Sequence, residues 1–340
     1  MAFLILLSLF SVWSTPAYAG TVDGLNLSSD SYLLMEAGSG QVLLGHNVFS
    51  PRHPASTTKI VTAILICDYE ECLPEIALVN RAAAFCAGSS MGLNPNERIT
   101  VQSLLFGAML PSGNDAATAL AYHMAGGEEW FAWMMNRKAR LLGAADAYFC
   151  NPHGLTCSRH LASAYDLATI TRYALQNPHF RNAVTRKSKV VASVDGSRIH
   201  YLVNTNRLLW EWPDISGVKT GTTATAGKCL VASAARYPRE LIAVVLRSAD
   251  RFNDARELLQ LGFAQFDSIS IGTDTLIQDS IGVTQDRALA ALRPFYWAFP
   301  ISEAKAIERR FHYRQRRLEI FFRGRMLDTI PLAPNRLRVK

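Results

Sequence analysis

The stretch Pro54-Ala55-Ser56-Thr57-Thr58-Lys59 leads directly into the apolar run Ile60-Val61-Thr62-Ala63-Ile64-Leu65. This pattern predicts a turn that feeds a buried helix, with Ser56 and Lys59 in the first turn of that helix. Residues three positions apart lie on the same helix face, so the amine of Lys59 can reach the hydroxyl of Ser56. A serine hydroxyl becomes a strong nucleophile when a neighbouring base takes its proton. A lysine can be that base when burial or a second positive charge keeps it neutral.

Two short segments downstream complete an ordered set: Ser112-Gly113-Asn114 and Lys219-Thr220-Gly221. Each segment alone is typical of an ordinary turn or strand end, but the three in this order mark penicillin-binding proteins and class A β-lactamases. Ser112 is placed to relay a proton, and Asn114 can hydrogen-bond the amide backbone of a peptide substrate. We interpret the last segment as an edge strand whose glycine, Gly221, lets a peptide lie alongside, with Lys219 as the second positive charge near Lys59.

With these motifs in place, the chain resembles the serine D-alanyl-D-alanine carboxypeptidases, the low-molecular-weight penicillin-binding protein family, over about residues 30–266. Four further segments carry the resemblance: Gly88-Ser89-Ser90-Met91-Gly92-Leu93, Leu110-Pro111-Ser112-Gly113-Asn114-Asp115-Ala116, Asn151-Pro152-His153-Gly154-Leu155 and Gly217-Val218-Lys219-Thr220-Gly221-Thr222-Thr223. It implies an α+β fold of the penicillin-binding protein/β-lactamase type, with an antiparallel sheet and a helical subdomain.

The resemblance also implies an activity and its partners. The expected reaction removes the terminal D-alanine from a peptidoglycan stem peptide ending in D-Ala-D-Ala, through an acyl-enzyme on Ser56, with β-lactam antibiotics as inhibitors. The backbone N–H groups of Ser56 and Thr222 are the implied oxyanion hole. Thr220 and Arg251 are candidates to receive the substrate's free carboxylate. No cofactor, metal or nucleic acid is expected, and His153 is not expected to be catalytic because Lys59 already fills the role of base.

Three alternatives remain at this point. A class A β-lactamase deacylates with a glutamate between its second and third motifs, and residues 130–210 contain no glutamate, which argues against that reading. Transpeptidase or endopeptidase activity on the same acyl-enzyme is poorly separated by sequence. A catalytically inactive cell-wall binding protein is disfavoured because the expected catalytic side chains are all present.

The pattern of apolar residues predicts how the chain is organised. Residues 31–44 predict a hairpin, residues 56–143 and 163–176 are mostly helical, and β-strand signals return after Lys189. A last helix is expected over about 253–266. This order of strands, helices, strands and a helix predicts a sheet whose first and last strands come together, and hairpin links between its strands make it antiparallel. We therefore predict a catalytic domain over residues 20–266 and a small β-rich C-terminal domain over 267–340, with strands near 318–322 and 326–330 around Gly324.

Export is indicated by the N-terminus. An apolar run from Phe3 to Trp13 ends in Ala17-Tyr18-Ala19, which predicts a signal peptide over residues 1–19, although no Lys or Arg precedes the run and an uncleaved anchor stays open. The expected location is the outer face of the cytoplasmic membrane, the periplasm or the cell wall. Six cysteines permit disulfides there, with Cys150–Cys157 the most plausible pair, whereas Cys229 fits a buried free thiol.

Composition and charge complete the picture. A chain of 340 residues with 49% hydrophobic and 19% charged residues is an ordinary globular protein. The formal charge is +7, and residues 267–340 contribute thirteen Lys and Arg residues against eight Asp and Glu residues. That tail could associate with an anionic membrane or cell-wall surface, although a solvated face explains it equally well. The residues after Pro334 are too few for a membrane-surface helix, so we expect the mature protein to be soluble.

Overall fold

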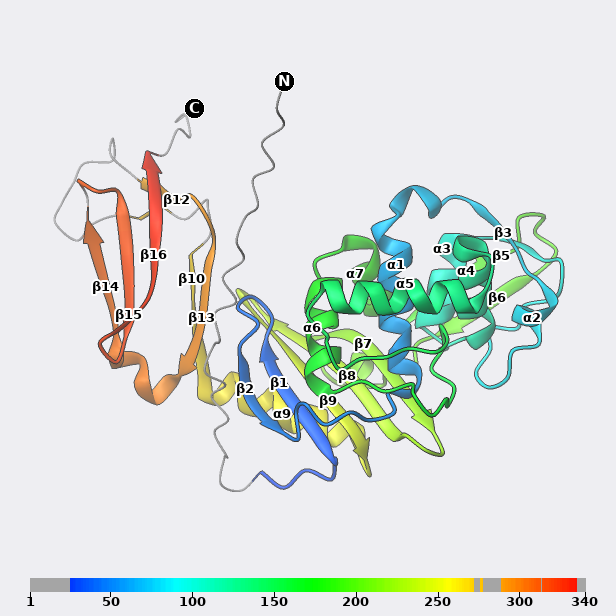
Figure 1. The fold of residues 1–340 in the computed structure, drawn as a ribbon, viewed down its shortest axis with the longest axis horizontal. Helices are drawn as coiled ribbons and strands as arrows, with labels where there is room; N and C mark the ends of the chain where they lie inside the picture. The colour runs from blue at the N-terminus through cyan, green and yellow to red at the C-terminus, as the bar shows by residue number, and fades with distance from the viewer. Residues whose placement is uncertain (1–24, 272–275, 278–288, 313, 335–340) are drawn as a thin grey trace.

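The computed structural model describes residues 25–271, 276–277, 289–312 and 314–334 (Figure 1). The predicted signal peptide, residues 1–19, and the tail after Pro334 lie outside the described residues. In the part of the chain that is described, no helix is long and apolar enough to span a membrane.

A five-stranded antiparallel sheet lies at the centre of the larger part of the molecule, in the order β2-β1-β9-β8-β7 (Figure 1). Its strands are β1 (Ser31–Glu36), β2 (Val42–His46), β7 (Ile215–Thr223), β8 (Gly227–Arg236) and β9 (Arg239–Ser248). Because β1 pairs antiparallel with β9, the first and last strands of this sheet are neighbours, as the sequence predicts. The strand β7, which carries the third motif, is an edge strand, also as predicted.

The sheet is buried on both faces. Side chains alternate along each strand, so Val231 and Val244 belong to the core shared with helix α1 (Lys59–Asp68), whereas Leu230 and Val245 face helix α9 (Arg251–Gln265). Burial on both faces explains why β8 and β9 appear in the sequence as nearly continuous apolar runs.

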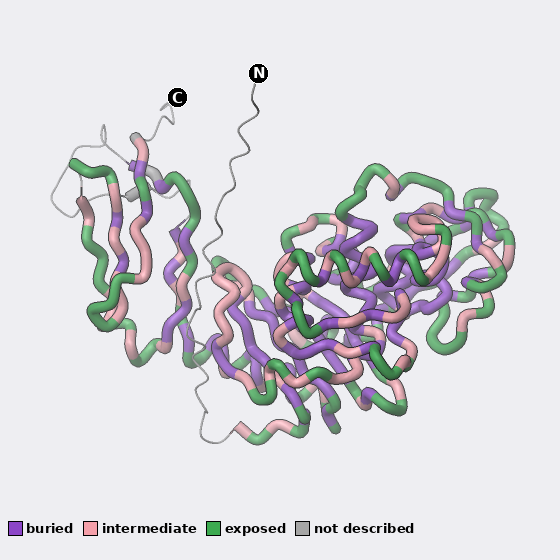
Figure 2. Tube along the Cα trace, in the orientation of Figure 1, coloured by how far each residue is buried: buried purple, intermediate pink, exposed green. Residues whose placement is uncertain are grey.

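Helix α1 runs through the middle of the helical part, and all of its residues except Asp68 are buried. A helix that is apolar on every side needs neighbours on every side. The helices in contact with α1 are α3 (Val101–Met109), α4 (Asn114–Ala125), α5 (Glu128–Leu141), α6 (Ala164–Ala174) and α7 (Pro178–Thr185). The short helix α2 (Arg81–Ala84) packs on α4, and α8 (Leu208–Glu211) packs on β7. Two small two-stranded antiparallel sheets complete this part: β3 (Ile76–Leu78) with β4 (Arg98–Thr100), and β5 (Ser188–Ala192) with β6 (Ile199–Val203). Figure 2 shows the buried segments concentrated in the sheet and around α1.

The C-terminal region is β-rich, as predicted, and has its own apolar core with Ile320 and Ile330 fully buried. Strands β10 (Phe266–Ile271) and β13 (Phe295–Pro300) pair with each other, and a second sheet has the order β11-β12-β16-β15-β14. The strands of that sheet are β11 (Leu276–Ile277), β12 (Leu289–Ala291), β14 (Ile307–His312), β15 (Arg317–Phe322) and β16 (Arg325–Pro334). The Gln41 side chain joins the two parts by donating to the Ala298 carbonyl at 3.2 Å and accepting from its N–H at 2.5 Å. The domain boundary between residues 266 and 267 remains our proposal.

Candidate active site

The turn before α1 holds Ser56 beside Lys59. Ser56 lies in a 3-10 turn, η1 (Ala55–Thr58), and Lys59 is the first residue of α1. The hydroxyls of Thr57 and Thr58 donate to the carbonyls of Pro54 and Ala55 at 2.7 and 2.8 Å, which closes the turn on itself. Ala55 has a φ of 49°, a conformation that is costly for a non-glycine residue and is concentrated at functional sites. The result is a contact of 3.1 Å between Lys59 Nζ and Ser56 Oγ.

Two carbonyl oxygens fix the Lys59 amine from the other side. Lys59 Nζ donates to Asn114 Oδ1 at 2.7 Å and to the backbone carbonyl of His153 at 2.9 Å. A neutral amine has two N–H groups and one lone pair around its nitrogen. With both N–H groups directed at carbonyls, the lone pair of the neutral form points at the hydroxyl of Ser56.

Burial favours that neutral form. Lys59 is completely buried, and burial lowers the pKa of its amine to about 7, although the nearby charges of Cys86 and Asp115 act in the opposite direction. Lys219 is buried in the same region, and burial, followed by the charges of Lys59 and Arg251, lowers the pKa of its amine well below the usual range. The two buried amines therefore resist being protonated together.

Asn114 begins α4 and is bonded on both sides of its amide. Its Nδ2 donates to the Ala87 carbonyl at 2.6 Å, and its backbone N–H donates to the Ser89 carbonyl at 2.6 Å. A Cβ on Gly88 would lie 2.7 Å from Asn114 Nδ2, so position 88 requires glycine for the chain to pass this close to the amide. Among the described residues, only one N–H of the Asn114 amide has a hydrogen-bond acceptor.

The next residue, Asp115, is fully buried and holds the loop 88–93 in place. Its carboxylate accepts hydrogen bonds from the backbone N–H groups of Met91, Gly92 and Leu93 and from the Ser90 hydroxyl. These bonds account for two of the segments that carry the family resemblance. The sequence of the two segments does not predict that one carboxylate joins them.

The second motif begins with Ser112, a residue that is 5% exposed and has a φ of 66°. This is a second non-glycine residue in the left-handed region at the site, beside Ala55. The fold brings Ser112 to the turn that starts α4, two residues from the Asn114 side chain that holds Lys59.

The edge strand β7 lies against the nucleophile turn. A Cβ on Gly221 would lie 2.9 Å from both the Pro54 carbonyl oxygen and the Ser56 nitrogen, so this close approach requires glycine. The Thr220 hydroxyl is 2.6 Å from that of Thr205, a neighbour that sequence reasoning did not find. Lys219 Nζ donates to the Thr220 carbonyl at 3.1 Å.

Arg251, at the start of α9, lies behind the end of β7. Its Nη1 donates to the Gly221 carbonyl and to the Thr222 hydroxyl, both at 2.7 Å, and to the Cys229 carbonyl at 3.3 Å. These bonds fix the strand end whose backbone was expected to form half of the oxyanion hole. Contact of Arg251 with a substrate carboxylate remains a prediction.

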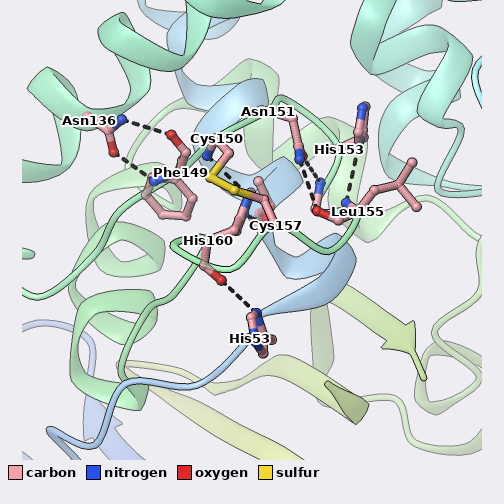
Figure 3. Close-up of a disulfide and its surroundings, with 11 residues drawn as sticks. His53, Asn136, Phe149, Cys150, Asn151, His153, Leu155, Cys157 and His160 are labelled. Carbon is pink, nitrogen blue, oxygen red and sulfur yellow. Dashed lines mark hydrogen bonds between the residues drawn. A yellow bond between two sulfur atoms is a disulfide. The ribbon is translucent and has the colours of Figure 1, made fainter. Parts of the chain in front are cut away.

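A disulfide closes the loop that supplies the His153 carbonyl (Figure 3). Cys150 and Cys157 are bonded, as the sequence predicts, and Cys229 is a buried free thiol, also as predicted. Inside the loop, Asn151 Oδ1 accepts from the Gly154 N–H at 2.7 Å, and Asn151 Nδ2 donates to the Leu155 carbonyl at 2.9 Å (Figure 3).

The same loop packs directly on the nucleophile turn. A Cβ on Gly154 would lie 1.9 Å from the Ala55 carbonyl oxygen. His160, just after the loop, bonds through Nδ1 to the Cys150 N–H at 3.2 Å and through Nε2 to the Thr58 hydroxyl at 2.8 Å. Burial lowers the pKa of His160 to about 3, so this histidine is neutral and its two hydrogen bonds join the loop to the nucleophile turn.

The side chain of His153 points away from Lys59 toward α5. Its Nε2 is 3.4 Å from Glu128 Oε1, which also accepts from the Thr118 hydroxyl at 2.7 Å. Residues 130–210 contain no glutamate, but Glu128, which lies just before that range, places a carboxylate near the site. In the described residues, no group of three or more His, Cys, Asp or Glu side chains could hold a metal ion.

This fold, with a serine and a buried lysine in hydrogen-bond contact at the start of a central helix, defines the class of penicillin-binding proteins. A family model of D-alanyl-D-alanine carboxypeptidases matches residues 18–250. D-alanyl-D-alanine carboxypeptidase DacD of Salmonella typhimurium is 32% identical over 339 residues, 92% of this chain and 85% of that protein. DacF of Bacillus subtilis is 35% identical over 246 residues, 70% of this chain and 63% of that protein.

Among solved structures, penicillin binding protein 5 from Haemophilus influenzae is similar at a TM-score of 0.77 and 25% identity, over 92% of this chain and 98% of that one. The chain belongs to the D-alanyl-D-alanine carboxypeptidase family. The family and the fold class predicted from the motifs are therefore confirmed.

Proposed function

We propose that this protein is a serine-type D-alanyl-D-alanine carboxypeptidase that removes the last D-alanine of a peptidoglycan stem peptide. The observation that carries the proposal is the 3.1 Å contact between Lys59 Nζ and Ser56 Oγ, with both remaining positions on the lysine nitrogen held by carbonyl oxygens. A base fixed in this way can take the serine proton as Oγ attacks the peptide carbonyl.

The proposed reaction has two halves. In the first, Lys59 takes the proton of Ser56, the oxyanion forms between the N–H groups of Ser56 and Thr222, and Ser112 passes a proton to the leaving amine of D-alanine. In the second, water enters the space that D-alanine has left and hydrolyses the ester, with Lys59 again as base. Gly221 supports this arrangement, since its close approach brings β7 to the Ser56 backbone nitrogen.

Substrate binding is proposed along the exposed edge of β7. The free N–H of Asn114 would bond a substrate carbonyl, and Lys219, Thr220 and Arg251 would attract the terminal carboxylate. A bound carboxylate would favour the charged form of Lys219, whose pKa burial and the charges of Lys59 and Arg251 lower in its absence.

Release of D-alanine tests the function. Purified protein is incubated with an N-acylated peptide ending in D-Ala-D-Ala, and free D-alanine is measured, with Ser56→Ala as the inactive control. A second measurement follows penicillin: an adduct on the peptide containing Ser56 that persists for minutes supports the carboxypeptidase, because the penicilloyl group blocks the path of water.

The same assays distinguish the alternatives. Rapid turnover of penicillin without a trapped adduct would make this a β-lactamase, and Glu128→Gln would then test the carboxylate that lies 3.4 Å from His153. Transfer of the acyl group to an added amino acid in preference to water would indicate a transpeptidase. Cleavage of a cross-linked dimer would indicate an endopeptidase.

We further propose that the protein is exported by a signal peptide over residues 1–19 and acts at the outer face of the cytoplasmic membrane, in the periplasm or at the cell wall. Peptidoglycan stem peptides and β-lactams are its proposed ligands. The disulfide between Cys150 and Cys157 supports an oxidising compartment.

A further inference from the structure

A second group of reactive side chains lies directly behind the catalytic lysine. The sulfur of Cys86 lies close to the imidazole of His153 and the hydroxyl of Thr118, and it donates to the Ala87 carbonyl at 3.9 Å. His153 Nε2 is 3.4 Å from Glu128 Oε1, and Thr118 bonds the same carboxylate oxygen at 2.7 Å. Thiol, imidazole and carboxylate thus stand in the order that activates a nucleophile elsewhere in enzymes.

The geometry of the loop sets the orientation of this imidazole. The Leu155 N–H donates to His153 Nδ1 at 3.2 Å (Figure 3), so Nδ1 is the acceptor and the ring proton lies on Nε2. That proton faces Glu128 and the Cys86 sulfur, where it stabilises a thiolate by donating to it. Cys86 is partly exposed, so its own proton can leave to water and a small reagent can reach the sulfur.

Cys86 differs from the other free thiols of the described residues. Burial and the charge of Glu128 raise its pKa, but the neighbouring His153 and Thr118 outweigh both and hold the pKa below the usual range. Burial raises the pKa of Cys67 to about 12 and of Cys229 to about 11, and it also raises that of Cys72. These three thiols are internal controls for any thiol reagent.

Two bonds connect Cys86 to the catalytic lysine. The next residue, Ala87, accepts from Asn114 Nδ2 at 2.6 Å, and Asn114 Oδ1 in turn holds Lys59. The imidazole that contacts the sulfur belongs to His153, whose carbonyl is the other acceptor of Lys59. A group attached to Cys86 would therefore lie next to Asn114 and His153, the two residues that direct the lone pair of Lys59 at Ser56.

We propose that Cys86 is a modification site through which a low-molecular-weight disulfide, such as glutathione disulfide, switches off acylation of Ser56. The Cys86 thiolate attacks one sulfur of the small disulfide, a new S–S bond forms to Cys86, and the original S–S bond breaks. The leaving thiolate carries away the electron pair and takes a proton from water, so no further oxidant is needed. The inhibitory half of this proposal rests on the proposed function, whereas the reactivity of Cys86 does not.

The first experiment measures reactivity alone. The folded protein is treated near pH 6.5 with glutathione disulfide or with a chromogenic aromatic disulfide, and the labelled peptide is identified by mass spectrometry. We expect one label, on Cys86, added at least about threefold faster than to a synthetic peptide of residues 82–90, because a lowered thiol pKa gains more in thiolate than it loses in nucleophilicity. Cys86→Ser should remove the label, and the matched control Cys72→Ser should keep it.

The second experiment measures the effect on the active site. Labelled protein should acylate with a fluorescent penicillin at least about tenfold more slowly than unlabelled protein, and a reducing agent should restore the rate. Cys86→Ser should acylate normally before and after treatment. His153→Gln, which keeps the backbone carbonyl, should slow the labelling of Cys86 to the rate of the peptide.

Each result has one meaning. Labelling of Cys86 no faster than the peptide, or labelling of Cys67, Cys72 or Cys229 in its place, overturns the proposed reactivity. Labelled protein that acylates at the unlabelled rate overturns the switch. Unlabelled protein that never forms a penicillin adduct on Ser56 refutes the proposed function instead, and it leaves the reactivity of Cys86 measurable by itself.

Discussion

Lowering the pH from 8 to 6 should slow the acylation of Ser56 by penicillin about tenfold. The base in this step is the neutral amine of Lys59, whose pKa burial lowers to about 7. At that pKa about nine tenths of the lysine is neutral at pH 8 and about one tenth at pH 6, which gives the tenfold ratio. The direction follows from the charge: protons added below pH 7 convert the base to its inactive ammonium form.

The assay is the second-order rate of acylation by a fluorescent penicillin, followed from pH 5 to 9 within the range where the protein stays folded. Penicillin is suitable because its own carboxylate stays ionised throughout this range. A matched variant is Lys59→Arg, since guanidinium remains protonated at every usable pH. Its rate should fall about 10²–10⁴-fold, the usual contribution of a general base, and should not recover at pH 9.

Two results would refute this reasoning. A wild-type rate that is flat between pH 6 and 8, or that rises only near pH 10, would mean that Lys59 is not neutral in the working enzyme. An arginine variant that keeps more than about a tenth of the wild-type rate would remove Lys59 from the role of base.

Three substitutions around the site give further expectations. The double variant Cys150→Ser with Cys157→Ser should lower the free energy of unfolding by about 2.5 kcal/mol, from the entropy of a short closed loop. It should also slow acylation, because the His153 carbonyl that accepts from Lys59 is then held less firmly. Gly154→Ala should lower the free energy of unfolding by about 2–4 kcal/mol, since its Cβ would lie 1.9 Å from the Ala55 carbonyl oxygen. Asp115→Asn should cost about 3 kcal/mol, as hydrogen bonds to a charged group are worth about 1.5–3 kcal/mol each.

Urea unfolding followed by fluorescence, together with penicillin acylation, checks all three. Unchanged stability of the serine double variant would mean that the loop is held by its other hydrogen bonds alone. A fully stable, active Gly154→Ala protein would contradict the close packing of the loop on the nucleophile turn. Normal acylation by Asp115→Asn would mean that the position of Asn114 does not depend on the loop 88–93.

The sequence predicted the fold well where the pattern was long or apolar. The run after Lys59 predicted α1 because a helix buried on every side must be apolar on every side. The hairpin at residues 31–44 and the run Leu241–Leu246 predicted the strands β1, β2 and β9 for the same reason. Periodicity does not give the neighbour of each strand. The pairing of β1 with β9 was expected from the order of strands, helices and strands along the chain, and its antiparallel direction from the hairpin links.

The sequence predicted the parts of the candidate site that are motif side chains, but not the backbone groups or the contacts that the fold creates. Ser56, Lys59 and Asn114 belong to short motifs whose spacing is fixed, and the structure brings them into contact. The second acceptor of Lys59 is a backbone carbonyl, which every residue has, so nothing in the letters around His153 could mark it. Cys86 was missed for a related reason, since its partners come from α4, α5 and the disulfide loop, which only the fold brings together.

The acceptors around Lys59 explain how the site combines burial with basicity. A buried lysine usually needs a carboxylate, and such a partner would hold it as an ammonium and raise its pKa. The carboxylate whose charge acts on Lys59, that of Asp115, is occupied by the N–H groups of the loop 88–93 and by a serine hydroxyl, so it supplies charge at a distance and no direct bond. The direct partners of Lys59 are the neutral carbonyls of Asn114 and His153 and the hydroxyl of Ser56. Neutral acceptors satisfy the N–H groups of the amine without favouring the ammonium as a carboxylate would, and this leaves burial free to bring the pKa to about 7, where Lys59 can both take and return a proton.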